Sequence, residues 1–187
     1  MAADPVILVT AGSAGLGAAT AKLFATKGYR VVINYSTNTK RAETLIKDLN
    51  SQNGGAVNNI AIQADLTSQK DVRRLVQEAY TAMGRIDVVF SNGGWTRFTN
   101  TTSIDDNVVD EDWNHAFTMN VKSHLWLLQA AKSYLDETEG AFITTSSLAG
   151  VYGMGSSLVG SAAVALEDWC NNCLIRPMLP QKPLNYT

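Results

Sequence analysis

A glycine-rich turn follows a short apolar run and precedes a segment rich in small residues; it reads Thr10-Ala11-Gly12-Ser13-Ala14-Gly15-Leu16-Gly17. Glycine lets the backbone turn tightly and approach a diphosphate, and a helix N-terminus offers free N–H groups and a positive dipole end. A sharp strand-to-helix turn without a ligand would need similar glycines. Because strand, turn, helix and second strand follow in order, we interpret the turn as a dinucleotide-binding loop. Its cofactor-binding residues are Thr10, Gly12, Ser13, Gly15, Leu16 and Gly17.

The residues after the second predicted strand indicate which dinucleotide this loop binds. An acidic residue there would accept hydrogen bonds from a ribose 2′-hydroxyl and repel a 2′-phosphate. This strand instead ends in Asn34-Tyr35-Ser36, and Lys40 and Arg41 follow before the first acid. Neutral polar groups backed by cations suit a 2′-phosphate, so the sequence favours NADP over NAD, with Asn34, Tyr35 and Ser36 as cofactor-binding residues. The alternative is that Lys40 and Arg41 are ordinary solvated helix residues.

Two alternating periodicities predict the elements that position these residues. Continuous apolar runs are typical of parallel strands buried on both faces, and apolar residues at helical spacing lie between them. This rhythm implies right-handed crossovers and an α/β fold, a Rossmann-like doubly wound parallel sheet in three layers, formed as one domain over residues 1–187. The predicted strands are 6–9, 30–35, 57–64, 86–90 and 141–145, and the predicted helices are 18–28, 40–50, 68–84 and 111–135.

The long helix and the loop before it carry further candidates. Residues 93–110 are polar and irregular, which is typical of a loop that lines a site. Trp95 and Phe98 either line a substrate pocket or pack under this loop. His115 and His124 are expected at the surface or an interface. One side of the helix carries an apolar stripe made of Trp113, Phe117, Val121, Leu125 and Leu128.

Composition excludes several classes of function. Hydrophobic residues make up 45% and charged residues 17% of 187 residues, which favours a globular chain. Fifteen Lys and Arg against seventeen Asp and Glu give a net charge of -2, so neither a nucleic acid nor a membrane surface is expected as a partner. Cys170 and Cys173 supply too few ligands for a metal site or a disulfide framework, and without a recognisable signal peptide we expect a cytoplasmic protein.

Five motifs in order resemble the short-chain dehydrogenase/reductase family over residues 5–158. The turn at Thr10–Gly17 resembles its Thr-Gly-x-x-x-Gly-x-Gly signature. Further matches are Asp65-Leu66 after the third strand, Ser91-Asn92-Gly93-Gly94 after the fourth, Asn120 in the long helix and the second serine of Ser146-Ser147 after the fifth. The resemblance implies that Asp65 and Leu66 lie near the adenine, and that Asn92, Gly93 and Gly94 also bind the cofactor.

The same resemblance implies an activity, the NADP(H)-dependent interconversion of a carbonyl and an alcohol. Ser147 would orient the carbonyl, and Asn120 would support a proton-relay water. The implied partners are a small carbonyl or alcohol substrate and, for many family members, further copies of the chain. Ser147 has an alternative interpretation as a strand-end serine that caps a turn.

The sequence also departs from the family pattern. Ala11 stands where the family has Gly, and Gly93 stands where it has Ala. The family's active-site Tyr and Lys fall at Gly160 and Val164, and Tyr152 is the only phenol nearby. The family is usually longer, so we expect a sheet without its last strands, a divergent segment 159–187 and an exposed fifth strand, as in a truncated or altered reductase product. Two hypotheses follow: a reductase, or a protein that binds the nucleotide without turnover.

Overall fold

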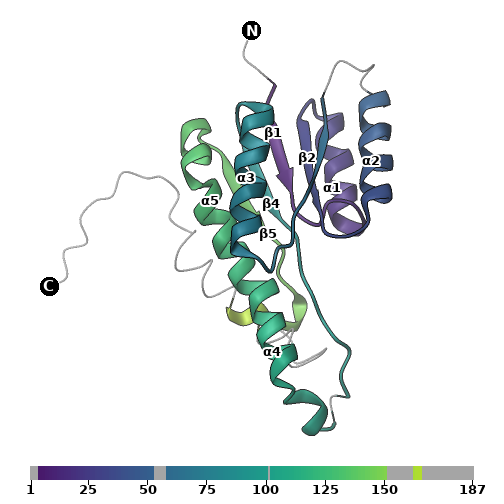
Figure 1. The fold of residues 1–187 in the computed structure, drawn as a ribbon, viewed down its shortest axis with the longest axis vertical. Coiled ribbons are helices and arrows are strands. Elements are labelled where there is room, and N and C mark those ends of the chain that lie inside the picture. The colour runs from purple at the N-terminus through teal and green to yellow at the C-terminus, as the bar shows by residue number, and fades with distance from the viewer. Residues whose placement is uncertain (1–3, 53–57, 101, 151–161, 166–187) are drawn as a thin grey trace, which may run out of the picture.

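A computed structural model of the chain describes residues 4–52, 58–100, 102–150 and 162–165 (Figure 1). The helices are α1 (Gly15–Thr26), α2 (Thr39–Gln52), α3 (Gln69–Met83), α4 (Asp110–Phe117) and α5 (Ser123–Thr138). The strands are β1 (Val6–Val9), β2 (Arg30–Tyr35), β3 (Ile60–Gln63), β4 (Val88–Ser91) and β5 (Ala141–Thr144). Two short 3-10 turns, Asp105–Asn107 and Leu148–Gly150, and a π-helical segment, Thr118–Lys122, complete the described elements.

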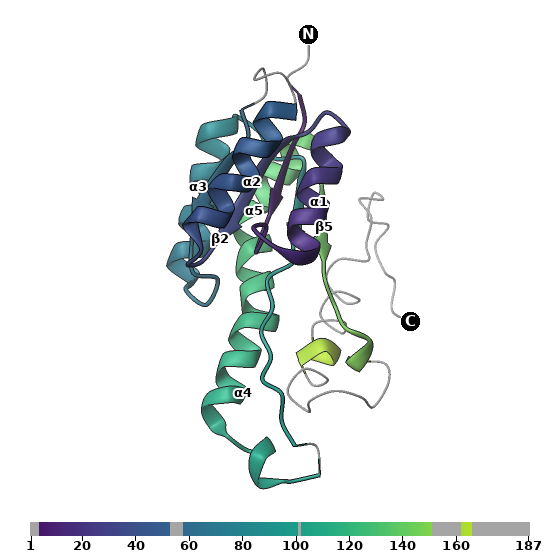
Figure 2. The same cartoon turned by 90° about the vertical axis from the view of Figure 1, so that its right-hand side faces the viewer.

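The strands form one parallel sheet in the order β3-β2-β1-β4-β5. Helices α1 and α2 cover one face of this sheet, and α3 and α5 lie side by side on the other. This arrangement confirms the predicted three-layer, Rossmann-like fold. A 90° turn shows α4 and the loop before it extending beyond the carboxyl ends of the strands (Figure 2).

The central strand β1 contributes residues to both hydrophobic cores. Its four residues are all fully buried. Because side chains alternate across a strand, Val6 and Leu8 join the core under α3 and α5, whereas Ile7 and Val9 join the core under α1 and α2. A continuous apolar run is therefore required here, since a polar residue at any of the four positions would enter one core or the other.

Local signals fix the ends of α3 as the sequence predicts. The Ser68 hydroxyl accepts a hydrogen bond from the Asp71 amide at 3.3 Å, and the helix ends at Gly84, which has a φ of 74°. Other predicted bounds are wrong by two or three residues: α1 begins at Gly15, β3 at Ile60 and β4 at Val88. Just before β4, the Asp87 carboxylate accepts a hydrogen bond from the Val6 amide at 2.7 Å.

The long helix presents a different face to the sheet than its apolar stripe indicates. Its buried side consists of Ala116, Ser123, His124, Leu127, Ala131 and Leu135, whereas Leu125 of the stripe is 43% exposed. Hydropathy ranks small and polar residues such as Ser123 low, yet they let the helix approach the sheet closely. A π-helical segment at Thr118–Lys122, with its i to i+5 hydrogen bond from Ser123 to Thr118, also interrupts the regular period.

Strand β5 lies at the edge of the sheet among the described residues, as expected. Ile143 of β5 stands beside Phe90 of β4 in the register. Phe90 is 8% exposed and Ile143 is 44% exposed, so the face of β5 on the α1 side lacks the cover that β4 has. The expectation of a single domain over 1–187 stays a prediction, because residues 151–161 and 166–187 lie outside the described part.

Candidate nucleotide site and adjoining cavity

The turn after β1 has the shape of an open cradle. A Cβ at Gly12 would lie 2.7 Å from the Ile33 Cβ, and one at Gly17 would lie 2.5 Å from the Ala11 carbonyl oxygen. Both glycines are therefore required for close packing. Gly15 has a φ of 51°, and a Cβ there would meet nothing within 4 Å, so the turn faces open space at this position. The residues present thus fit a loop whose backbone a diphosphate can approach.

Ala11 adopts an unusual conformation for its residue type. Its φ is 48°, in the left-handed region that favours glycine. This position is the one at which the family has Gly. The turn therefore keeps the glycine conformation without the glycine, which leaves strain of about 1 kcal/mol in the loop.

Two predicted cofactor-binding side chains hold the turn in place. The Thr10 hydroxyl accepts hydrogen bonds from the amides of Asn92 at 2.9 Å and Gly93 at 3.2 Å. The buried Asn34 side chain accepts a bond from the Ala11 amide at 3.2 Å and donates to the Ala64 carbonyl at 3.1 Å. Their side chains are therefore engaged with the protein backbone and fix the cradle on the sheet.

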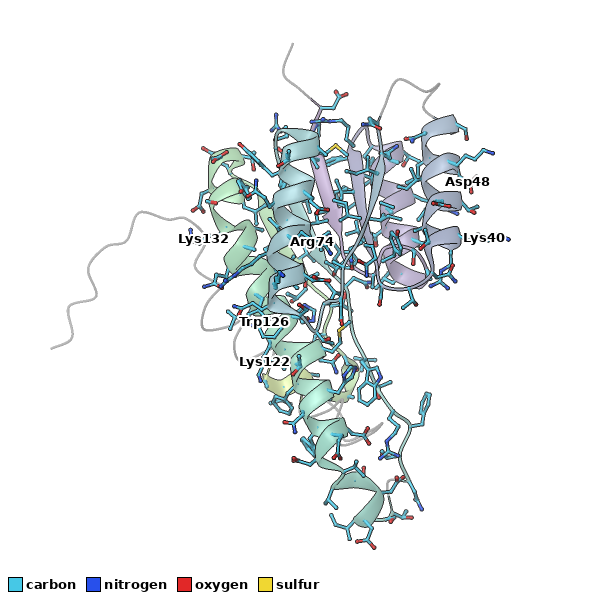
Figure 3. All side chains as sticks on the ribbon, in the orientation of Figure 1. Lys40, Asp48, Arg74, Lys122, Trp126 and Lys132 are labelled. Carbon is cyan, nitrogen blue, oxygen red and sulfur yellow. The ribbon has the colours of Figure 1, made fainter. Side chains whose placement is uncertain are left out.

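A second, open hollow of about 420 Å³ adjoins the turn on the side of α2. Arg41 donates from Nη2 to the Ser13 hydroxyl at 3.5 Å, which brings the cation to the edge of the turn. Lys40 and Asp48 lie on α2 along the same side (Figure 3). Three cations and one carboxylate therefore surround this hollow. It is lined by Ser13, Ala18, Lys22, Asn38, Lys40, Arg41, Thr44, Leu45 and Asp48.

The remaining predicted adenosine-side residues have varied surroundings. Tyr35 ends β2 and is half-buried, and Ser36 is exposed. The exposed Asp65 carboxylate accepts bonds from the Thr67 amide at 2.9 Å and the Thr67 hydroxyl at 2.8 Å. Leu66 is buried and lies against Gly93, where a Cβ would come within 2.3 Å of Leu66 Cδ1. This contact explains why Gly93 is smaller than the family's Ala.

A cavity of about 230 Å³ lies at the carboxyl ends of β4 and β5. Ligands in open parallel sheets bind at this edge. At this edge the Asn92 side chain links the segments that follow β1 and β5. It donates to the Thr10 carbonyl at 3.4 Å and accepts from the Thr145 hydroxyl at 3.3 Å. The lining residues are Asn92, Gly93, Gly94, Trp95, Thr96, Asn120, His124, Thr145, Ser146, Ser147 and Ala163.

Asn120 and Ser147 both line the cavity, but their side chains differ in their hydrogen bonds. The Asn120 side chain accepts from the Trp95 amide at 2.7 Å and donates to the Trp95 carbonyl at 2.8 Å, so both ends of its amide hold the loop backbone. The Ser147 hydroxyl accepts from the Ala149 amide at 3.2 Å, which is the turn-capping arrangement. A hydroxyl that accepts one bond keeps its own O–H as a donor, so Ser147 caps a turn and still offers a donor to the cavity.

Comparison with known proteins decides the family. A family model described as short chain dehydrogenase matches residues 5–166. The chain belongs to the short-chain dehydrogenase family. A hydroxynaphthalene reductase of Aspergillus fumigatus is 31% identical over 169 residues, covering 90% of this chain and 59% of that protein. A versicolorin reductase of Emericella nidulans is 29% identical over 169 residues, covering 90% of this chain and 61% of that protein.

Solved structures agree with this assignment. A short-chain dehydrogenase from Burkholderia cenocepacia in complex with NADP has a TM-score of 0.82 and 31% identity, covering 90% of this chain and 66% of that one. An NADP active-site complex from Pseudomonas aeruginosa has a TM-score of 0.79 and 25% identity, covering 91% and 66%. The chain spans about three fifths of the curated relatives described above. It is thus a member of an oxidoreductase family whose solved relatives include NADP complexes.

His124 is a buried cavity residue, whereas the sequence predicted a position at the surface or an interface. It is 2% exposed, and its Nδ1 lies 2.6 Å from the Ser91 hydroxyl. Burial lowers the pKa of His124 to about 4, against the smaller opposing effect of a backbone hydrogen bond with Gly93. The imidazole is therefore neutral at neutral pH. The sequence around His124 gives no sign of this burial. Its partner Ser91 directly precedes the motif Asn92-Gly93-Gly94, but nothing in the sequence links the two residues.

Several contacts join the described residues of the loop between β4 and α4 to one another and to α4. Arg97 pairs with Asp106 at 2.8 Å and with Asp112, and the charge-assisted bond to Arg97 lowers the pKa of the Asp106 carboxyl. The Trp113 indole N–H donates to the Asn107 carbonyl at 2.8 Å. Trp95 lines the cavity as one interpretation predicted, whereas Phe98 is 96% exposed and lies neither in the cavity nor under the loop.

Several sequence candidates fall outside the described residues. These are Tyr152, Gly160, Cys170 and Cys173. Val164, the position of the family's Lys, is described and is 45% exposed. Within the described ranges, no group of three or more His, Cys, Asp or Glu side chains could hold a metal ion. No helix in those ranges is long and apolar enough to cross a bilayer.

Proposed function

We propose that this chain binds NADP(H) and serves as the nucleotide-binding part of a reductase that interconverts a small carbonyl compound and an alcohol. The observation that carries the proposal is the continuity of the cradle at Gly12–Gly17 with the cationic hollow beside it. Arg41 joins them, because it contacts Ser13 of the turn while it lines the hollow. A diphosphate needs the first feature, and a 2′-phosphate needs the second.

The hollow supports NADP rather than NAD. Lys22, Lys40 and Arg41 surround it with one carboxylate, Asp48. An Arg guanidinium binds a phosphate through paired, charge-assisted hydrogen bonds, whereas a neutral ribose hydroxyl gains little from three nearby cations. The contact between Arg41 and Ser13, at 3.5 Å, supports a phosphate-binding role for Arg41 over the alternative of an ordinary solvated helix residue.

A titration with both nucleotides tests this preference. We expect NADPH to bind at least about tenfold more tightly than NADH, because hydrogen bonds to charged groups contribute about 1.5–3 kcal/mol. Arg41→Ala should weaken NADPH binding about tenfold and leave NADH binding unchanged. Lys47→Ala is the matched control, since Lys47 is an exposed cation on α2 that does not line the hollow. Equal affinity for the two nucleotides in the wild-type chain would contradict the preference for NADP.

The cavity beside the cradle is the proposed substrate site. NADPH, when bound, supplies the hydride that reduces a carbonyl. Ser147 offers its O–H to the carbonyl oxygen from the end of β5. Asn120 acts as a positioning residue, because its side-chain amide is engaged with Trp95 at both ends. Thr10 and Asn34 likewise position the cradle, and the amides of Ser13, Gly15, Leu16 and Gly17 would hold the diphosphate. The Gly12 amide donates to the Asn34 carbonyl at 2.8 Å, so Gly12 contributes through its close packing.

A second candidate function is nucleotide binding without turnover. The family's Tyr and Lys fall at Gly160 and Val164, and neither side chain can donate a proton or carry a charge. A positioned general acid contributes about 10²–10⁴ in rate, so its loss would leave hydride transfer feeble. An NADPH oxidation assay with ketones and quinones separates the two candidates. Binding without oxidation, with oxidation restored in Gly160→Tyr/Val164→Lys, favours the second; oxidation by the unmodified chain favours the first.

A further inference from the structure

Trp95 lies in a loop, yet contacts with other segments hold both its backbone and its ring. Its backbone N–H and carbonyl are both bonded to the Asn120 side chain, at 2.7 and 2.8 Å. Its indole ring lies edge-on to the His115 ring, with centroids 4.6 Å apart and an interplanar angle of 78°. The residue is therefore fixed at its backbone by the long helix and at its ring by α4, and it lines the cavity.

The cavity has two chemically different parts. Thr145, Ser146 and Ser147, at the end of β5, bring hydroxyl groups to it. Trp95, on the loop after β4, brings the one aromatic side chain larger than imidazole among the lining residues that the structure describes. A ligand that satisfies both parts carries an oxygen at one end and an apolar, flat body at the other.

Size and rigidity narrow the class of ligand further. An apolar cavity of about 150 Å³ accepts a benzene ring. This cavity of about 230 Å³ is shared with the cofactor, whose proposed residues Asn92, Gly93 and Gly94 also line it, so the substrate is a compact ring compound. Aromatic rings that meet in offset or edge-to-face geometry are favoured over aliphatic groups of equal area. Because Trp95 is already fixed by Asn120 and His115, a stacked ligand orders little of the protein when it binds.

We propose that Trp95 is a specificity-determining residue and that the cavity takes a carbonyl compound or alcohol whose reacting carbon is attached to a planar aromatic ring. The proposal rests on the proposed function, since it places the substrate of that reductase in this cavity. It adds the substrate class and the residue that selects it. His115 and Asn120 act through Trp95 as positioning residues.

A matched pair of ketones tests this inference without turnover. 1-Tetralone and 1-decalone share a fused bicyclic skeleton and a carbonyl, and only the first has an aromatic ring. Calorimetric titration of the full chain, with saturating NADP+ and again without nucleotide, measures binding to a form that cannot reduce the ketone. We expect tetralone to bind about fivefold more tightly than decalone, the ratio that one aromatic contact provides.

Substitutions of Trp95 test whether this residue causes the difference in affinity between tetralone and decalone. Trp95→Leu should bring the tetralone-to-decalone ratio to about one, and Trp95→Phe should keep most of it. Phe98→Leu is the matched control, because Phe98 is an aromatic residue of the same loop that lies outside the cavity. Circular dichroism checks that each variant is folded. The wild-type ratio alone keeps the test decisive if Trp95→Leu fails to fold.

Each outcome has a distinct meaning. A wild-type ratio of about one, or a ratio that survives in Trp95→Leu, overturns the inference. Failure of both ketones to bind, with and without NADP+, also overturns it, while NADP+ binding in the same cell would leave the nucleotide site standing. Failure of NADP+ to bind while tetralone binds selectively would overturn the proposed reductase and keep the aromatic site.

Discussion

The turn after β1 and the end of β5 meet at one edge of the sheet, yet the protein builds them very differently. In the turn, Thr10 and Asn34 are buried, and their side chains hold backbone amides of neighbouring segments. At β5, Ile143 is 44% exposed, and Ser147 is held by a local bond to Ala149. Long-range contacts thus preorganise the proposed nucleotide cradle, whereas Ser147, the proposed catalytic serine, depends mainly on its own strand end.

This difference explains why binding and turnover are separate questions for this chain. The cradle is fixed by residues from β2, β4 and the turn itself, all within residues 4–93. The proposed hydride transfer would depend instead on the cavity, which residues after β5 such as Ser147 line. We therefore expect nucleotide binding to be the more robust property and substitutions in the two regions to have unequal effects.

The largest difference in stability is expected between substitutions of Phe90 and Ile143, which are neighbours on one face of the sheet. Phe90→Ala should lower the free energy of unfolding by about 3–5 kcal/mol, because it opens a cavity in the core. Ile143→Ala, beside it in the register, should cost about 1 kcal/mol, because the side chain is already half in water. Urea unfolding monitored by circular dichroism measures both. Equal costs would mean that β5 is as well covered as β4.

The buried His124 predicts that the free energy of unfolding depends on pH, with an effect similar in size to that of Phe90→Ala. Its pKa is lowered to about 4 in the folded chain, so the unfolded chain binds a proton at a higher pH than the folded chain does. The free energy of unfolding should therefore fall as the pH falls from about 6.5 to about 4, by about 3 kcal/mol. His124→Gln should flatten this window relative to wild type. Parallel urea series at about pH 7 and about pH 4.5 give the answer.

Two glycines of the cradle should respond differently to the same substitution. Gly17→Ala places a methyl group against a backbone oxygen and should cost about 2 kcal/mol of stability. Gly15→Ala meets open space and should cost about 1 kcal/mol, from its positive φ alone. Both should weaken NADPH binding in a fluorescence titration. A Gly15→Ala variant as unstable as Gly17→Ala would show that the turn is more closely packed than its geometry indicates.

The smallest expected effect is a gain. Ala11→Gly relieves a left-handed φ at the position where the family has glycine, and it should raise the free energy of unfolding by up to about 1 kcal/mol. The added freedom of glycine in the unfolded chain offsets part of this gain. A variant less stable than wild type in thermal unfolding would mean that Ala11 carries no strain.

Sequence reasoning predicted the elements whose signals are local. The apolar run Val6–Val9, the Ser68 cap and Gly84 each determine their own neighbourhood, and all three are confirmed. Glycine spacing in the turn also has a local steric cause. The fold class followed from the order of these elements, because parallel strands require crossovers of one hand.

The residues that the sequence placed poorly depend on distant partners. His124 is buried because β4 brings Ser91 to it, and Asn34 turns to the Ala11 amide and to β3 rather than outward. Arg41 and Ser13 lie 28 positions apart and meet only when α2 packs beside the turn. Neither hydropathy nor spacing encodes these contacts, so a polar residue at the end of a strand could have faced either a ligand or the fold.

Amide hydrogen exchange, with and without saturating NADP+, tests the central claim most directly. If backbone amides of the turn hold the diphosphate, exchange should slow markedly across residues 13–17, because the Ala11 and Gly12 amides already donate to Asn34, while the amides of β5, Ala141–Thr144, should change little. Unchanged exchange across residues 13–17 at a nucleotide concentration that saturates the protein would contradict the account. The nucleotide would then bind elsewhere on the chain.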